Sequence, residues 1–132
     1  MPEGDGGTTG SLGAGPVANE ATLVYNRSDS ITNTVAIGGA GSVIQAGSGT
    51  LTLAVANTHA GGTTINTSGS LVLAGNDRLL TTGNLTLNAG TFNLGGYAQS
   101  LVAVTQTGGL ISNGSLSFTT LELQAGTVDA VL

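Results

Sequence analysis

The segment Gly49-Thr50-Leu51-Thr52-Leu53-Ala54 decides the fold, because it returns about twenty residues later as Gly69-Ser70-Leu71-Val72-Leu73-Ala74. A looser copy follows as Gly83-Asn84-Leu85-Thr86-Leu87-Asn88. Each copy is a glycine turn followed by strict alternation of apolar and polar residues, the period of a strand with one buried face. Self-similarity at this period is typical of a solenoid, in which each repeat buries its apolar face against the next.

The composition excludes several classes of protein. The chain has 132 residues, of which 7% are charged, and a net charge of −5. Its two basic residues are Arg27 and Arg78, so no basic patch for nucleic acid or anionic lipid can form. The apolar runs are too short for a helical membrane span, and no signal peptide is visible at the N-terminus. With 39% hydrophobic residues and no cysteine, the chain can bury a core without disulfides.

Strand signals recur along the whole chain, whereas helix signals are almost absent. The expected strands are 22–25, 31–37, 42–46, 50–54, 63–66, 70–74, 84–88, 91–94, 100–104, 110–112, 115–123 (broken near Thr120) and 127–130. Such short strands fit either an antiparallel sandwich or barrel, or a parallel β-helix. The repeats favour the β-helix, because equivalent strands of successive coils stack in register about 4.8 Å apart.

We therefore predict an all-β, right-handed parallel β-helix (β-solenoid) with about three short strands per coil and about six coils. Residues 1–20 would form a partial first coil or an N-terminal extension, and residues 21–132 the β-helical repeat domain. The predicted core ladder consists of Leu51, Leu53, Ile65, Leu71, Leu73, Leu85, Leu87, Phe92, Leu94, Leu116, Phe118, Leu121 and Leu123. The predicted turn glycines, which accept positive φ at sharp corners, are Gly49, Gly61, Gly62, Gly69, Gly83, Gly95 and Gly96.

Outward positions of the strands carry threonine, as at Thr50, Thr52 and Thr86. Threonine favours the extended backbone, and its hydroxyl can pair with a Thr or Ser one coil away. The resulting surface is polar without charge, which matters because like charges stacked about 4.8 Å apart would repel.

Residues that could carry chemistry are few. His59 is the only histidine, and we expect an exposed loop residue or a substitute for an aromatic one rather than a metal ligand. Asp77 and Arg78 form a turn with a local ion pair of little value. The carboxylates are widely scattered, with Glu122 on the outward side of an alternating strand. We therefore predict no catalytic, cofactor-binding or metal-binding residues and no cofactor.

The stretch Gly49-Thr50-Leu51-Thr52-Leu53-Ala54-Val55-Ala56-Asn57-Thr58-His59-Ala60-Gly61-Gly62-Thr63-Thr64-Ile65-Asn66 resembles the autotransporter-associated β-strand repeat. The clear resemblance covers about residues 40–75, and a looser one most of the chain. Val55 stands where the repeat usually has glycine, and His59 where it usually has an aromatic residue. The resemblance implies a β-helical stalk in the passenger of a Gram-negative autotransporter, a repeat linked to passenger transport and folding.

The expected function is therefore structural: a stalk, spacer or filament-forming segment that is extracellular or on the bacterial outer-membrane surface. Neither end looks capped, so the expected partners are further β-helix coils of a parent chain or identical subunits stacked head to tail, with neither nucleic acid nor membrane insertion. The alternative is an adhesin that recognises glycans or another surface array through exposed Thr, Asn and the two tyrosines Tyr25 and Tyr97. A polysaccharide-active enzyme would need converging carboxylates.

Overall fold

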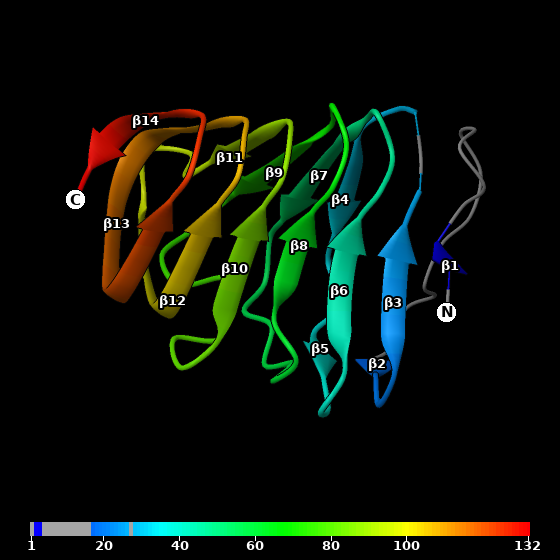
Figure 1. The fold of residues 1–132 in the computed structure, drawn as a ribbon. Helices are drawn as coiled ribbons and strands as arrows, with labels where there is room; N and C mark the ends of the chain where they lie inside the picture. The colour runs from blue at the N-terminus through cyan, green and yellow to red at the C-terminus, as the bar shows by residue number, and fades with distance from the viewer. Residues whose placement is uncertain (1, 4–16, 27) are drawn as a thin grey trace.

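The computed structural model describes residues 2–3, 17–26 and 28–132, and every regular element in these ranges is a β-strand (Figure 1). The strands are β1 (Pro2–Glu3), β2 (Val17–Ala18), β3 (Thr22–Tyr25), β4 (Ile31–Asn33), β5 (Ile37–Gly38), β6 (Ser42–Gln45), β7 (Thr50–Leu53), β8 (Thr63–Ile65), β9 (Ser70–Leu73), β10 (Asn84–Leu87), β11 (Thr91–Asn93), β12 (Ala98–Gln106), β13 (Leu110–Leu123) and β14 (Thr127–Val131). Within this described part, no helix is long and apolar enough to cross a membrane.

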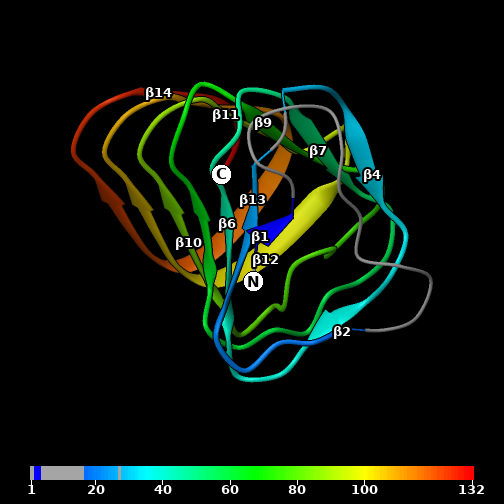
Figure 2. The same ribbon diagram turned by 90° about the vertical axis from the view of Figure 1, so that its right-hand side faces the viewer.

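These strands form a parallel β-solenoid of about six turns, as predicted. Face A stacks β1, β3, β6, β8 and β10 and continues into the C-terminal parts of β12 and β13. Face B stacks β4, β7, β9, β11, the start of β13, and β14. Face C holds β2 and β5 and, further along, the N-terminal part of β12 beside the middle of β13. Figure 2 shows successive turns lying one behind another around a closed cross-section.

The register explains the repeat in the sequence. Leu23, Val43 and Thr63 are paired in succession on face A, so one turn there takes twenty residues. On the same face Val104 pairs with Leu85 on one side and with Leu121 on the other, so the turns shorten to seventeen residues at the C-terminal end. Each of these shorter turns has fewer residues for its corners. β12 and β13 therefore continue from one face to the next, whereas in earlier turns a corner separates the strands of neighbouring faces.

The expected strands 22–25, 42–46, 50–54, 63–66, 70–74, 84–88 and 91–94 all recur within one residue of their predicted bounds. The expected strand 31–37 splits into β4 and β5, because Asn33 turns inward and its Oδ1 accepts a hydrogen bond from the Val35 amide. The expected break near Thr120 was wrong, and β13 is continuous from Leu110 to Leu123. Its register shifts between Ser112 and Ser115, where Asn113 has a φ of 66°, and its alternation changes phase at Thr119 and Thr120, which are both exposed.

The described residues of the predicted extension 1–20 are few, since residues 1 and 4–16 lie outside the described part. Of the strands in this extension, β1 pairs in parallel with β3, and β2 pairs in parallel with β5.

Alternation along each strand separates the core from the surface. On β3, β6, β7 and β9 half-buried and buried residues alternate, so every second side chain enters the solenoid. On the surface, Thr22 Oγ1 lies 3.3 Å from Ser42 Oγ one turn away, the hydroxyl pairing expected from the sequence. A longer surface ladder joins Asn66, Asn88 and Thr107, whose side chains are hydrogen-bonded across three turns at 3.0 and 2.8 Å.

Candidate functional site: the coil ladder and the C-terminal edge

The inward residues of face B form the clearest part of the coil ladder, by which we mean the stacked apolar side chains inside the solenoid. Leu71 is in register with Leu51 on one side and with Phe92 on the other, and Phe92 is in register with Ile111. All four are buried. The apolar stack thus passes from turn to turn without interruption, and its burial contributes roughly 25 cal/mol per Å² of apolar area.

Ten of the thirteen predicted ladder residues are buried in the structure: Leu51, Leu53, Ile65, Leu71, Leu73, Leu85, Leu87, Phe92, Leu94 and Leu116. The other three lie on β13, where Phe118 and Leu121 are half-buried and Leu123 is 52% exposed. Leu123 is therefore not a core residue in the structure. Residues 116–123 pair with β12 on one side only, so no described turn covers Leu123 from the other side.

The turn glycines are required for two different reasons. Gly62, Gly95 and Gly96 have φ between 67° and 90°, as expected for sharp corners. Gly69 is not left-handed, but a Cβ at this position would collide with the carbonyl oxygen of Gly47 in the preceding turn. Close approach of successive turns, rather than corner geometry, also explains the glycines at positions 49 and 61. At Gly83 the nearest atom would be the Leu80 carbonyl oxygen, 3.0 Å away.

Buried amide side chains at the corners were not predicted from the sequence. Gln45 lies at the inward end of β6, and its Nε2 donates to the carbonyls of Gly49 at 3.2 Å and of Ser70, one turn on, at 3.1 Å. Gln106 occupies the equivalent position of β12 and makes the same pair of bonds, to Gly109 at 3.1 Å and Thr127 at 3.0 Å. The sequence contains a signal for this role, because side chains two residues apart on a strand lie on the same face, and Gln45 follows the inward Val43 by two residues.

A second corner holds the buried amides Asn33, Asn57 and Gln99. Asn57 Oδ1 accepts from the Ile37 amide at 2.9 Å and from Asn33 Nδ2 at 3.3 Å, both in the preceding turn. Its Nδ2 donates to the Arg78 carbonyl, in the next turn, at 3.3 Å. These side chains form hydrogen bonds with backbone N–H and C=O groups that have no partner in the strand pairing at this corner, and they join adjacent turns.

His59 is buried, with 3% of its surface exposed, so of its two expected roles the exposed loop residue is wrong and the substitute for an aromatic residue agrees with the structure. Its Nε2 lies 2.8 Å from Thr63 Oγ1. Burial lowers the pKa of His59 below its ordinary value, and the Ile37 backbone opposes this shift more weakly. The side chain therefore acts as part of the packed interior, in the neutral form.

Asp77 and Arg78 do not form the expected local ion pair. Asp77 has a φ of 49°, and its Oδ1 accepts a hydrogen bond from the Ser100 amide at 2.8 Å. The Arg78 guanidinium lies over Gly75, and its buried Nε has no hydrogen-bond partner among the described residues. The carboxylate thus serves the backbone of the next turn instead of the neighbouring arginine.

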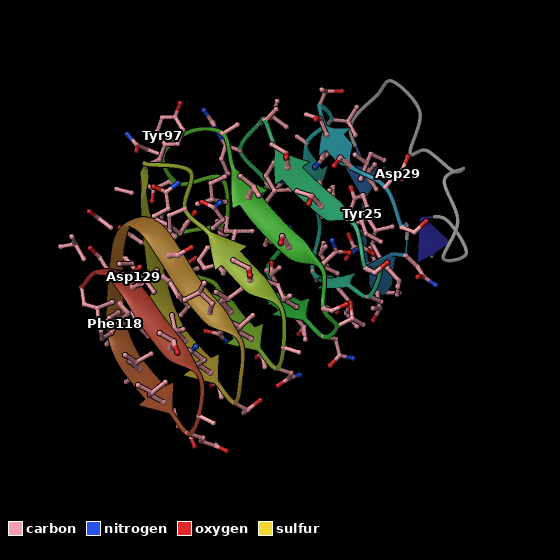
Figure 3. All side chains as sticks on the ribbon, turned by 90° about the horizontal axis from the view of Figure 1, so that it is seen from above. Tyr25, Asp29, Tyr97, Phe118 and Asp129 are labelled. Carbon is pink, nitrogen blue, oxygen red and sulfur yellow. The ribbon has the colours of Figure 1, made fainter. Side chains whose placement is uncertain are left out.

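The C-terminal edge, defined as residues 116–123 of β13 together with β14, has no strand on its outer side in the described part of the chain. Its apolar residues are unusually accessible: Leu123 is 52%, Val131 67% and Leu132 60% exposed. Figure 3 places Phe118 and Asp129 at this end of the solenoid, away from Tyr25 and Asp29 at the other end. The described residues contain no group of three or more His, Cys, Asp or Glu that could hold a metal ion.

Comparison with known protein families gives a match within the repeat region. Residues 43–73 match the family model of the passenger-associated-transport-repeat. No curated protein and no solved structure matches the chain. The matched segment spans β6 to β9, and so includes the Leu51–Leu71 part of the ladder together with Gln45, Asn57 and His59. Residues 43–73 are thus similar to the passenger-associated-transport-repeat, which agrees with the autotransporter-associated repeat that the sequence was predicted to resemble.

Proposed function

We propose that this chain is a stalk or spacer segment of an autotransporter passenger, lying outside the cell or at the outer-membrane surface. The observation that carries the proposal is the coil ladder, in which buried apolar residues stack through successive turns of one rod. Each turn lengthens such a rod by about 4.8 Å. The transport repeat at residues 43–73 supports the passenger context.

The mechanism is mechanical and involves no reaction. Because each turn buries its apolar side chains against its neighbours, stability comes from contacts between adjacent turns. Further coils of a parent chain at the C-terminal edge would extend the same interface. A filament of identical subunits stacked head to tail is the other form of this proposal.

An adhesive role has less support than a spacer role. Of the two tyrosines that could meet a ligand, Tyr25 is buried with 1% of its surface exposed, and only Tyr97, at 42%, is accessible. A single exposed aromatic residue offers a small platform for a glycan.

A change in the number of turns tests rod building directly. Duplicating residues 43–62 directly after residue 62 adds one full turn in the observed register. Small-angle scattering should show a rod longer by about 4.8 Å, with thermal stability at least equal to that of the original chain. The control duplicates only residues 43–52 after residue 52, which adds half a turn and breaks the register. If both insertions lower stability equally, the rod-building role is wrong.

Surface display tests the passenger role. The chain is fused ahead of a translocating outer-membrane β-barrel in a Gram-negative host, and the protease-accessible fraction is measured on intact cells. Leu71→Asp places an unpaired charge in the ladder and should reduce display strongly. Thr32→Asp, on the exposed side of β4, is the matched control and should leave display unchanged. Equal display of both variants would contradict a role for the folded rod in transport.

A further inference from the structure

The corner at which β13 passes from face B to face C is built on Asn113-Gly114, the only Asn-Gly pair in the sequence. Ser112 pairs with β11 and Ser115 with β12, but neither residue between them belongs to a strand pair, and the pairing with β14 skips both. Asn113 is exposed and Gly114 is half-buried. The two residues therefore form a bulge at the surface, outside the strand pairing.

The geometry of this corner explains why it holds both residue types. Asn113 has a φ of 66°, a left-handed conformation that asparagine adopts more readily than most residues other than glycine. A Cβ at Gly114 would lie 2.4 Å from the Tyr97 carbonyl oxygen and 2.5 Å from Leu94 Cβ, both in the preceding turn. Asparagine followed by glycine is thus the order that the backbone angle and the close approach of the preceding turn favour.

The same order favours a reaction of the chain with itself. The backbone nitrogen of the residue after an asparagine can lose its proton and attack the side-chain Cγ, which forms a cyclic succinimide as the Cγ–Nδ2 bond breaks and ammonia leaves. Water then adds to either carbonyl of the ring and opens it to aspartate or isoaspartate, so one water is consumed for each ammonia released. Glycine in the second position favours the attack, because it has no Cβ to crowd the nitrogen and its backbone reaches more conformations.

The side chain and the carbonyl of Asn113 both bind the preceding turn. Its Nδ2 donates to Asn93 Oδ1 at 3.2 Å, and its carbonyl oxygen accepts a hydrogen bond from the Gly96 amide at 2.6 Å. Asn93 Oδ1 also accepts the Gly95 amide at 2.8 Å. A carboxylate at position 113 would have no proton to donate to Asn93 Oδ1 and would face it as a second acceptor.

We propose that Asn113 is a site of spontaneous deamidation in the folded protein, and that its conversion breaks the side-chain link between β13 and the preceding turn. Isoaspartate has a further effect. In this product the main chain runs through Cγ, so the carbonyl that accepts the Gly96 amide becomes a free carboxylate outside the main chain. The inference rests on the geometry of the corner and does not need the passenger role.

Ageing of the wild-type protein tests the proposal. The folded chain is incubated in mildly alkaline buffer, and peptide mapping by mass spectrometry follows each asparagine over time. Asn113 should deamidate about tenfold or more faster than Asn88, which is also exposed but is followed by Ala89, whose Cβ crowds the attacking nitrogen. The rate at Asn113 should rise with pH, because that nitrogen must lose its proton. If Asn88 is converted as fast as Asn113, or if Asn113 reacts only after unfolding in urea, the proposal is wrong.

Two variants test the site and the consequence of its modification. Asn113→Gln keeps a side-chain amide but would have to form a larger ring, so it should resist deamidation. Asn113→Asp carries one product from the start and should melt at a lower temperature than the wild type. Equal melting temperatures would contradict the loss of the link to Asn93.

Hydrogen exchange separates the two products. Exchange at the Gly96 amide should accelerate in the isoaspartate fraction of the aged protein, isolated by chromatography, because the acceptor has left the main chain. It should stay close to the wild-type rate in Asn113→Asp, which keeps that carbonyl in place. Slow exchange at Gly96 in the isoaspartate fraction would overturn the proposed effect on the corner.

Discussion

Replacement of Leu71 by alanine is the most direct quantitative test of the coil ladder. Leu71 is 1% exposed and lies in register between Leu51 and Phe92. The change removes three carbon atoms, worth about 2.4 kcal/mol at about 0.8 kcal/mol each. Strand pairing holds both neighbouring turns in place, so the cavity cannot collapse fully, and the free energy of unfolding should fall by about 3–4 kcal/mol in total.

Urea unfolding followed by circular dichroism measures this loss. Val72→Ala is the matched control, because Val72 is the next residue on β9 but points outward and is half-buried. Its cost should stay at or below about 1 kcal/mol. Both midpoints are compared together with the slope, since loss of cooperativity between turns would change the slope as well. A loss below about 1 kcal/mol for Leu71→Ala, or equal losses for both variants, would refute the view that stacked apolar residues hold the turns together.

Three further changes address the corners. Asn57→Ala leaves the buried Ile37 amide without its acceptor, so stability should fall by about 1–3 kcal/mol and hydrogen exchange at that amide should accelerate; unchanged exchange there would contradict the assigned bond. Because the pKa of His59 is lowered in the folded protein, its contribution to stability is complete above about pH 6.5 and is lost progressively as the pH falls through the folded-state pKa; the melting temperature of the wild type should therefore fall relative to that of His59→Phe between pH 8 and pH 5, and a constant difference would contradict the lowered pKa. Gly69→Ala forces a collision with the preceding turn and should cost more than Gly96→Ala, where nothing lies within 4 Å and only the φ of 86° is strained, at about 1 kcal/mol; equal thermal shifts would remove the distinction between the two kinds of glycine.

The sequence predicted the strands well because alternation reports directly on which side chains face inward. On β7 and β10 apolar residues are buried and polar residues are more exposed, and the twenty-residue echo coincides with the register of Leu51 with Leu71. The alternation within each strand and the repeat between turns thus identify the same inward-facing residues, and the fold could be predicted from either pattern.

Features that depend on a neighbouring turn were not predictable from alternation. Leu123 continues the same alternating pattern as Leu87, yet Leu87 lies between two neighbouring turns, whereas no turn in the described part of the chain covers Leu123 from its outer side. Gln45 is polar but inward, because its amide finds two carbonyl partners only when the next turn is in place. The glycine at position 69 is explained by a carbonyl in another turn rather than by its own backbone angles.

The buried amides also explain how a chain without cysteine can make such corners. Asn57 accepts hydrogen bonds from the preceding turn and donates one to the following turn, so its polar groups are satisfied only when both are folded. A turn in the middle of the rod is therefore stabilised from two sides, whereas a turn at an edge is stabilised from one.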